Sequence, residues 1–412
     1  MSDQARVYVD IQGQSVPAGT AFFRHGRGQV STTFTYDTEY LKKRQAYDLD
    51  PALPLSPAPS TVSGLPGAFQ DCSPDRWGRN LVQKEYRRLV QEGLARDRRL
   101  TDVDYLLGVS DQTRQGALRF KLSDDTDFVT AGSKVPKMIS LPTLQRAADQ
   151  VGDEDGPAIK TLLDAGTGSL GGARPKASVL GDDDHLMIAK FSHANDEWSV
   201  IAWEKTALEL ARRAKVETPA STLLQVGERP VLVLDRFDRT PDQRIGYMSA
   251  MTATRRGDRE PGDYLDVIEA SEDYSRNPRR DQEEIFRRIA VSVAIRNTDD
   301  HLRNHGFLRR VSGWEMSPVF DINPQPDLNV QRQTAINGAT EAEHEAEALM
   351  ELAPYCGLSA TRAKEITAEV IDATSPWSPV ARHHGVIESE IRAFEQMFTA
   401  QKTSLQKAAG LS

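Results

Sequence analysis

The sequence has few cysteines and no long apolar run. Only two cysteines, Cys72 and Cys356, occur among 412 residues, far apart and without the spacing of a metal or redox motif. Their rarity excludes a disulfide framework and fits a reducing compartment. No apolar stretch approaches the length that crosses a bilayer, and segment 1–6 is not an apolar signal segment. We therefore expect a cytoplasmic protein that has no membrane partner.

An excess of positive charge, internal repeats and low-complexity tracts are also missing. The formal net charge is −9, which excludes general nucleic-acid binding by the whole surface. Two local basic patches, Arg255-Arg256 with Arg259 and Arg279-Arg280, are typical of solvated loops. The remaining composition is that of an ordinary globular protein, with 39% hydrophobic and 27% charged residues. A chain of this length is too long for one small core, so we expect two or three lobes.

Strand patterns are concentrated in the first half of the chain. Short apolar and polar runs alternate over residues 7–36 between glycines, which predicts a small antiparallel sheet. Two hairpins are predicted at 177–191 and 223–234, with a helix at 200–216 between them. A helix is predicted at 76–94, with Ser73-Pro74-Asp75 as its start signal. Further helices are predicted in this half from Thr101 onward, at 141–151 and at 157–165, and a strand is predicted at 117–122.

Helical patterns dominate the second half. They are predicted at 263–270, 282–296, 339–353, 359–371 and 385–398, with two short strands between the second and third. A strand-rich half followed by a helix-rich half indicates a two-lobed α+β layout. The two halves meet at Asp235-Arg236-Phe237-Asp238-Arg239, and adenine commonly docks on backbone groups at such a hinge.

One segment between a predicted helix and a predicted hairpin carries the strongest chemical signal. Residues 297–306 read Asn-Thr-Asp-Asp-His-Leu-Arg-Asn-His-Gly, so that Asp299 and Asn304 stand in the order Asp-x-x-x-x-Asn, and Asp321 follows later. A carboxylate can orient a hydroxyl and accept its proton, while an amide oxygen and a second carboxylate can hold magnesium against nucleotide phosphates. This order predicts phosphoryl transfer. Asp300 is a second carboxylate beside Asp299, and only the spacing to Asn304 selects Asp299.

A glycine-rich segment lies upstream. Residues 166–176 read Gly-Thr-Gly-Ser-Leu-Gly-Gly-Ala-Arg-Pro-Lys, which suits backbone that approaches a ligand closely or a tight turn. The Gly-Lys-Ser/Thr ending of a Walker loop is missing. Lys190, in the second strand of the next hairpin, has apolar neighbours, as a lysine reaching inward toward phosphates would. Glu204, in the helix that follows, either pairs with Lys190 or lies at the surface.

Two weaker metal hypotheses also arise. His301 and His305 have the i, i+4 spacing of zinc ligands on a helix, but their segment is typical of a loop and no third soft ligand is near. The acidic run 182–184 before His185 could suggest calcium, but it lies at a hairpin turn and lacks the EF-hand spacing.

Three segments in order, 169–176, 235–239 and 297–304, resemble the HipA family of serine/threonine kinases, the toxin halves of bacterial toxin–antitoxin pairs. The resemblance covers nearly the whole chain and implies a two-lobed protein-kinase-like fold. It implies a small N-terminal β-rich subdomain over 1–100, a kinase N-lobe with the Gly-rich loop over 101–236, and an α-helical C-lobe with the catalytic loop over 237–412.

The resemblance also implies a role for each matching residue. Asp299 is the implied catalytic base, Asn304 and Asp321 are the implied magnesium ligands, and Lys190 offsets developing charge. The implied ATP contacts come from Lys176, Lys190, Asp235, Phe237, His301, Asn304 and Asp321. In the family, the serine at the position of Ser169 is autophosphorylated, which displaces the loop and silences the kinase.

Partners follow from the same resemblance. The family typically phosphorylates a protein, with glutamyl-tRNA synthetase the known example, and a helix-turn-helix antitoxin binds the kinase and operator DNA together. We therefore expect an ATP- and Mg²⁺-dependent kinase with a HipB-like antitoxin, operator DNA reached through it, and a protein substrate such as an aminoacyl-tRNA synthetase. Two alternatives stay open: a small-molecule phosphotransferase, favoured less by the Ser169 loop, and a pseudokinase co-repressor, which the intact catalytic positions count against.

Overall fold

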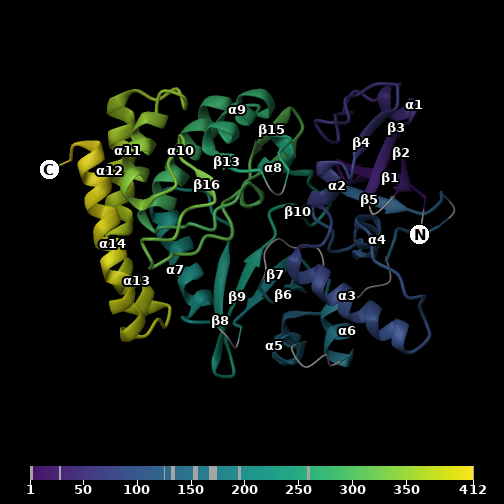
Figure 1. The fold of residues 1–412 in the computed structure, drawn as a ribbon, viewed down its shortest axis with the longest axis horizontal. Helices are drawn as coiled ribbons and strands as arrows, with labels where there is room; N and C mark the ends of the chain where they lie inside the picture. Colours follow the sequence, from purple (N-terminus) through teal and green to yellow (C-terminus); the bar gives the residue numbers. More distant parts are fainter. Residues whose placement is uncertain are drawn as a thin grey trace. The chain divides into compact units, whose positions relative to one another are not determined.

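The computed structural model describes residues 3–26, 29–124, 126–130, 135–151, 156–166, 174–193, 196–257 and 260–411. The chain divides into two compact units, Met1–Ala194 with Leu224–Met248 and Asn195–Leu223 with Ser249–Ser412. The chain therefore leaves the first unit once and returns to it before the second unit is complete. Figure 1 follows this path by colour, from purple at the N-terminus to yellow at the C-terminus.

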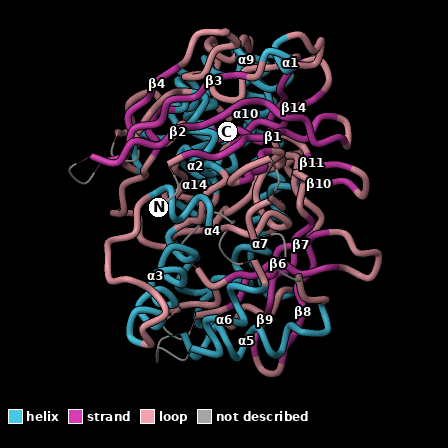
Figure 2. Tube along the Cα trace, turned by 90° about the vertical axis from the view of Figure 1, so that its right-hand side faces the viewer, coloured by secondary structure: helices cyan, strands magenta, loops and turns pink. Residues whose placement is uncertain are grey.

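An antiparallel sheet forms the N-terminal part of the first unit. Its strands are β1 (Gln4–Ile11), β2 (Gln14–Gly26), β3 (Gln29–Tyr36), β4 (Ser60–Ser63) and β5 (Leu118–Lys121). They pair in the order β4-β3-β2-β1-β5, and Figure 2 shows β1, β2 and β3 running side by side. The sheet predicted over 7–36 is confirmed, because the alternation places Ala5, Val7 and Val9 in the core on one face.

Short helices contribute to the core of this sheet. They are α1 (Thr38–Leu41), α2 (Gly67–Asp71) and α4 (Asp102–Gly108). The predicted helix start at Thr101 is confirmed, since the Thr101 and Asp104 side chains form a capping box at the beginning of α4. The Phe69 ring packs edge to face against Phe34 and Phe120, at centroid separations of 6.2 and 5.2 Å, which fixes α2 on the sheet.

A second sheet lies later in the first unit. Its strands are β6 (Lys176–Leu180), β7 (Leu186–Phe191), β8 (Ser221–Val226) and β9 (Arg229–Asp235), in the order β6-β7-β9-β8. Both hairpins predicted from the sequence are therefore confirmed. The helices of this region are α3 (Arg76–Gln91), η1 (Met138–Ser140), α5 (Leu141–Gln150) and α6 (Gly156–Asp164). Trp77 of α3 belongs to the same buried core as Ala177 of β6 and Val233 of β9, so α3 packs with this sheet.

The second unit is mostly helical. Its helices are α7 (Val200–Arg213), α8 (Ala250–Ala253), α9 (Tyr264–Tyr274), α10 (Pro278–Ala294), α11 (Ala342–Leu352), α12 (Ala360–Thr374), α13 (Trp377–His383) and α14 (Glu388–Ala409), with the turn η4 (Leu302–Asn304). The short strands β10 (Arg239–Thr240) and β11 (Gln243–Arg244) still belong to the first unit, and β12 (Tyr247–Ser249) lies where that unit ends. The second unit holds β13 (Gly262–Asp263), β14 (Gly306–Arg310), β15 (Gly313–Met316) and β16 (Thr334–Ala335). All the helices predicted in the second half of the sequence are present.

Helix α13 was not predicted from the sequence. Pro376 occupies its N-cap position, and proline is tolerated there because the first turn of a helix has no intrahelical partner for the missing N–H. Its Trp377 ring stacks on Phe398 of α14 at 4.3 Å, while Trp203 of α7 stacks on Phe394 at 3.9 Å. These stacked rings stabilise the packing of α7, α13 and α14. Among the described residues, no helix combines the length and the apolar character needed to cross a membrane.

Candidate active site

The segment 297–306 begins where α10 ends, and its starting point is rigidly held. Arg296 adopts the left-handed conformation (φ +57°), and the N–H of Asn297 donates to the carbonyl of Ser292 at 2.8 Å, which closes the helix end. The Arg296 guanidinium is buried, and its Nη1 lies 2.5 Å from Glu345 Oε1. Its Nη2 donates to the Val330 carbonyl at 2.5 Å. A left-handed arginine is therefore maintained by buried polar contacts on its side chain.

Asp299 lies exposed on this segment and has an unusual pKa. Partial burial by the surrounding protein raises the pKa of the carboxyl above its ordinary value, and the imidazole of His301 opposes that shift. The carboxylates of Asp321 and Asp300 raise the pKa of Asp299 further, because like charges disfavour the ionised form. The structure therefore places Asp299 close enough to Asp321 for their charges to interact.

Asn304 is tied to Asp299 through the backbone. Its side-chain Nδ2 donates to the main-chain carbonyl of Asp299 at 3.1 Å, and its N–H donates to the carbonyl of His301 at 2.8 Å. The turn η4 thus brings a buried amide beside the exposed carboxylate. Because the amide nitrogen is engaged by that carbonyl, the amide oxygen is the atom suited to a cation.

Asp321 follows β15 and adopts a left-handed backbone (φ +58°), which non-glycine residues seldom do. Two residues later, the N–H of Asn323 donates to Asn297 Oδ1 at 3.2 Å and joins this turn to the start of the loop. The described residues contain no cluster of three or more His, Cys, Asp or Glu side chains that could hold a metal ion. A carboxylate and an amide oxygen are hard donors that fit Mg²⁺ when phosphates and water complete the octahedron.

Asp300 is adjacent to Asp299 in sequence but has different surroundings. Its carboxylate is buried and accepts from Ser292 Oγ at 3.1 Å and from the Tyr264 hydroxyl, while His305 Nε2 lies 3.0 Å away. Burial alone would raise the pKa of Asp300, but His305 and the hydrogen bond from Tyr264 hold it well below its usual range. His305 thus contacts the Asp300 carboxylate, in place of the zinc ion that the spacing of His301 and His305 suggested.

Three neighbours of this loop were not found from the sequence. Gln333 Nε2 donates to Asp299 Oδ1, and Arg332 binds Glu345 through two bonds of 2.9 and 3.2 Å. Gln333 and Arg332 come from an irregular stretch around β16, where neither periodicity nor a turn signal marks a contact with residue 299. Tyr264, which opens α9, belongs to a helix that was predicted without a role.

In the first unit, the two predicted phosphate-binding lysines are direct cross-strand partners. Lys176 on β6 lies opposite Lys190 on β7, so both side chains leave the same face of the sheet. Both residues are buried, at 2% and 8% relative exposure. Lys176 Nζ lies 2.8 Å from Asp75 Oδ2, an ion pair whose acidic partner the sequence had marked only as a helix start.

The predicted hinge begins at the end of β9. Asp235 is opposite Met187 in the sheet, and its Oδ1 lies 3.1 Å from His185 Nε2. The ring of Phe237 is near that of Tyr247, at a centroid separation of 6.4 Å. Both predicted adenine contacts are thus placed at a sheet end, as the sequence suggested, and their role stays a prediction.

Asp238 in the same motif is a buried anchor. It accepts from Arg236 through two bonds of 2.8 and 2.6 Å, from the Gly116 N–H at 2.8 Å and from Arg239 at 2.9 Å. Burial would raise the pKa of Asp238, but the two guanidinium groups hold it well below its usual range. Charge pairs therefore fix the motif internally, and the hydrogen bond from the Gly116 N–H joins it to the segment that precedes β5.

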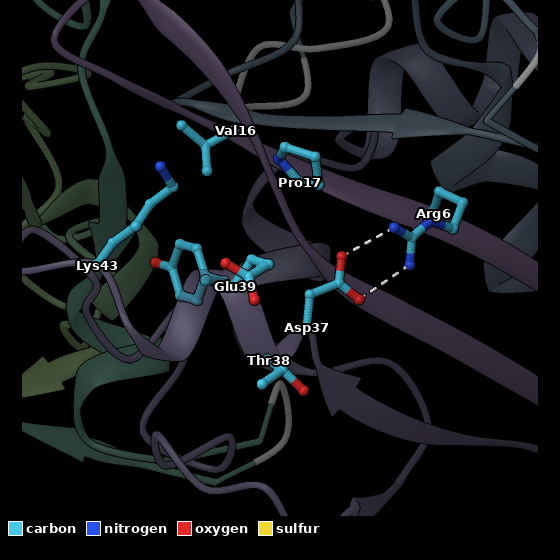
Figure 3. A pocket seen from close by; sticks show the side chains of 8 residues that line it. Arg6, Val16, Pro17, Asp37, Thr38, Glu39 and Lys43 are labelled. Atoms are coloured by element: carbon cyan, nitrogen blue, oxygen red, sulfur yellow. Dashed lines mark hydrogen bonds and ion pairs between the residues drawn. The ribbon is translucent and has the colours of Figure 1, made fainter.

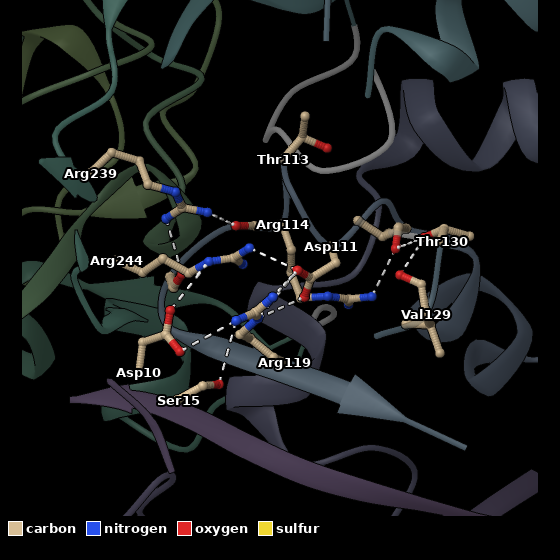
Figure 4. A network of polar contacts seen from close by, with 12 residues as sticks. Asp10, Ser15, Asp111, Thr113, Arg114, Arg119, Val129, Thr130, Arg239 and Arg244 are labelled. Carbon is tan, nitrogen blue, oxygen red and sulfur yellow. Dashed lines mark hydrogen bonds and ion pairs between the residues drawn. The ribbon is translucent and has the colours of Figure 1, made fainter. Parts of the chain in front are cut away.

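A second charged network surrounds this segment and is shown in Figure 4. Asp111 binds Arg119 at 2.6 Å and Arg244 at 2.9 Å, and Arg244 Nε lies 3.4 Å from Asp10. These pairs join β1, β5 and β11 within the first unit.

Most of the glycine-rich segment, residues 167–173 with Ser169, lies outside the described residues. Gly166 is described and adopts φ +67°, and a Cβ on it would come within 2.3 Å of Thr113. Glycine is therefore required at the start of the segment. A cavity of about 420 Å³ in the first unit lies elsewhere, against β1 and α1, and Figure 3 shows its lining with the Arg6–Asp37 pair. It contains no predicted site residue.

Two family models match the sequence. Residues 168–377, half of the chain, match the HipA-like C-terminal domain, and residues 9–100 match the HipA N-terminal domain. The chain belongs to the HipA family. The family predicted from three motifs is thereby confirmed.

Comparison with solved structures bears on the fold alone. The chain is similar to a chain of the Shewanella oneidensis MR-1 toxin–antitoxin complex of HipA, HipB and operator DNA, with a TM-score of 0.67 at 15% identity over 98% of this chain and 97% of that one. A Helicobacter pylori proinflammatory kinase, CtkA, matches with a TM-score of 0.42 at 14% identity over 58% of this chain and 91% of that one. No curated protein matches the sequence. The predicted HipA-type α+β fold with a β-rich N-terminal part is confirmed.

The HipA family assignment leaves the individual residue roles as predictions. The domain boundaries at residues 100 and 236 also stay predictions.

Proposed function

We propose that this HipA-family chain is an ATP- and Mg²⁺-dependent serine/threonine protein kinase. The observation that carries the proposal is the placement of Asp299. It is an exposed carboxylate with a raised pKa, next to the Asn304 amide and near the Asp321 carboxylate. The alternative base, Asp300, is buried in hydrogen bonds and faces no open surface. This contrast supports the choice that residue spacing made.

In the proposed reaction, Asp299 orients the serine hydroxyl of the substrate and accepts its proton. The hydroxyl oxygen forms a bond to the γ-phosphorus of ATP as the bond to the ADP oxygen breaks. The raised pKa strengthens Asp299 as a proton acceptor. Asn304 Oδ1 and Asp321 would hold Mg²⁺, which neutralises phosphate charge when bound. Lys176 and Lys190 would contact the phosphates.

We extend the proposal to partners. The similar Shewanella structure contains HipB and operator DNA, which supports a HipB-like antitoxin and operator DNA as partners of this chain. A protein substrate such as an aminoacyl-tRNA synthetase is proposed from the family alone. Autophosphorylation of Ser169, as self-inactivation, is proposed on the same ground.

Replacing the base tests the proposal. Asp299→Asn keeps the size of the side chain but removes the proton acceptor, so transfer of labelled phosphate from ATP should fall by about 10²–10⁴-fold. Asp327→Asn is the matched control, because this exposed aspartate caps a nearby turn at Asn329. Labelling of substrate by Asp299→Asn at the rate of the unmodified protein would exclude Asp299 as the base.

The same assay separates the alternatives. Transfer to small molecules but to no protein would favour a small-molecule phosphotransferase. Antitoxin binding without ATP binding would favour a pseudokinase co-repressor.

Self-inactivation is tested at Ser169 by mass spectrometry. After incubation with ATP and Mg²⁺, the protein should gain one phosphate at this serine, and Ser169→Ala should keep its activity for longer. Phosphorylation of another protein without any modification of Ser169 would contradict self-inactivation.

A further inference from the structure

The Asp75–Lys176 ion pair connects the two parts of the chain that the family models match separately. Asp75 lies in the part matched by the HipA N-terminal domain, and Lys176 in the part matched by the HipA-like C-terminal domain. Their charged atoms are 2.8 Å apart, with side-chain exposures of 7% and 2%. Such a pair is desolvated, so its geometry matters more than that of a surface ion pair.

The Asp75 carboxylate is held by two different contacts. It is the N-cap of α3, where Oδ1 accepts from the Gly78 N–H at 2.7 Å, while Oδ2 binds Lys176. Trp77 in the first turn of α3 is buried in the core of the sheet that carries Lys176. The capping hydrogen bond and the apolar packing of α3 therefore fix the position of the Asp75 carboxylate independently of its contact with the Lys176 ammonium group.

Lys176 needs such a partner because of its neighbour across the strands. It lies directly opposite Lys190, and two like charges at opposed positions on one face of a sheet repel each other. Both lysines are nevertheless buried. The negative charge of Asp75 offsets one of the two cations on this face.

We propose that Asp75 is a positioning residue for ATP, through which the N-terminal domain helps to build the nucleotide site. It acts by fixing the Lys176 ammonium, one of whose donors binds Asp75. A fixed ammonium loses less conformational freedom when it binds a phosphate, so affinity rises. The inference rests on the proposed function, in which Lys176 contacts the phosphates of ATP.

The variant Asp75→Asn isolates the charge. Asparagine caps helices as well as aspartate, so the contact with Gly78 is kept while the ion pair is lost. In the full chain, binding of ATP with Mg²⁺, measured by calorimetry, should weaken by at least about tenfold. Asp37→Asn is the control, because Asp37 is also an N-cap aspartate with a basic partner, Arg6 at 2.8 Å, but lies by α1 away from both lysines.

A second comparison separates a loss of ATP binding from a loss of folding in Asp75→Asn. In Lys176→Gln, the ammonium is already absent, so adding Asp75→Asn should leave the Kd for ATP unchanged, although the Tm should rise as an unpaired carboxylate is removed. Binding by Asp75→Asn that equals or exceeds that of the unmodified chain would overturn the inference. So would a further tenfold loss in the double variant. Failure of the unmodified chain to bind ATP would instead overturn the proposed function.

Discussion

In the first unit Lys176 lies buried against Asp75, whereas in the second unit Asp299 lies exposed near another carboxylate, Asp321. The basic residues proposed to meet ATP thus include one that already has a counter-ion. In the second unit, the carboxylate proposed to meet magnesium, Asp321, raises the pKa of the proposed base, Asp299. The difference is what a cofactor would require: fixed cations for the phosphates, and a concentration of negative charge that a divalent cation relieves.

Within each unit, a buried acid also lies beside a more exposed residue. Asp238 in the first and Asp300 in the second are buried carboxylates with lowered pKa values, each beside a residue that was predicted to touch substrate or nucleotide. In both places a paired, buried acid fixes the backbone from which its more exposed neighbour projects. We therefore expect changes at the buried acids to act on stability and changes at the exposed ones to act on activity.

The largest stability effect is expected for Asp238→Asn. It removes the charge that pairs with Arg236 and Arg239 and leaves both guanidinium groups in a buried environment. Breaking a buried pair in this way costs about 3–5 kcal/mol of unfolding free energy, measured by urea titration. The control is Asp235→Asn in the same motif, where the half-exposed partner His185 predicts a loss below about 1 kcal/mol. Equal losses in the two variants would contradict the comparison.

A smaller effect, dependent on pH, is expected for Asp300→Asn. Because the folded pKa of Asp300 lies below its unfolded value, ionisation of this group stabilises the protein above the unfolded pKa of about 4. That contribution is lost as the pH falls from about 4 toward the folded pKa. Thermal unfolding measured from pH 7 to pH 3 should show a Tm that falls less steeply in the variant. A variant with the same slope as the unmodified protein would show that Asp300 is not a stabilising anion.

The sequence predicted the elements of this fold better than their contacts. Period-2 alternation at Val7 and Val9 and the capping signal at Thr101 are local properties, and the structure confirms both. Helix α13 was missed because Pro376 reads locally as a breaker, although the stacking of Trp377 on Phe398 of the next helix stabilises it. Tertiary packing, and not the local sequence, determines that this segment is helical.

The candidate site shows the same limit. The spacing of Asp299 and Asn304 within one turn is a local signal, and the structure places the two residues in contact. Distinguishing Asp299 from Asp300 required burial and hydrogen bonds from Tyr264 and Ser292, which come from other helices. Asp75 is recognisable in the sequence as the start of a helix. Its contact with Lys176 spans 101 positions of the chain, so no local pattern indicates that contact.

The smallest expected effect concerns the residue that tunes the base. Gln333 donates to Asp299 and so lowers the pKa of that carboxyl, against the effect of burial. Gln333→Ala should therefore raise the pKa of Asp299 and move the acid limb of the kcat profile to higher pH. At alkaline pH, where the base is ionised in both proteins, kcat should agree within about twofold.

Gln331→Ala is the control for this tuning, because Gln331 binds Glu341 instead of Asp299. An acid limb that stays in place, or moves to lower pH, would show that the hydrogen bond from Gln333 does not set the proton affinity of the base. The residual rate of Asp299→Asn should show no acid limb. A limb that moves in Gln333→Ala and is missing in Asp299→Asn would assign the titration to Asp299. The pH profile would then report directly on the exposed carboxylate, while Asp300 beside it stays ionised throughout.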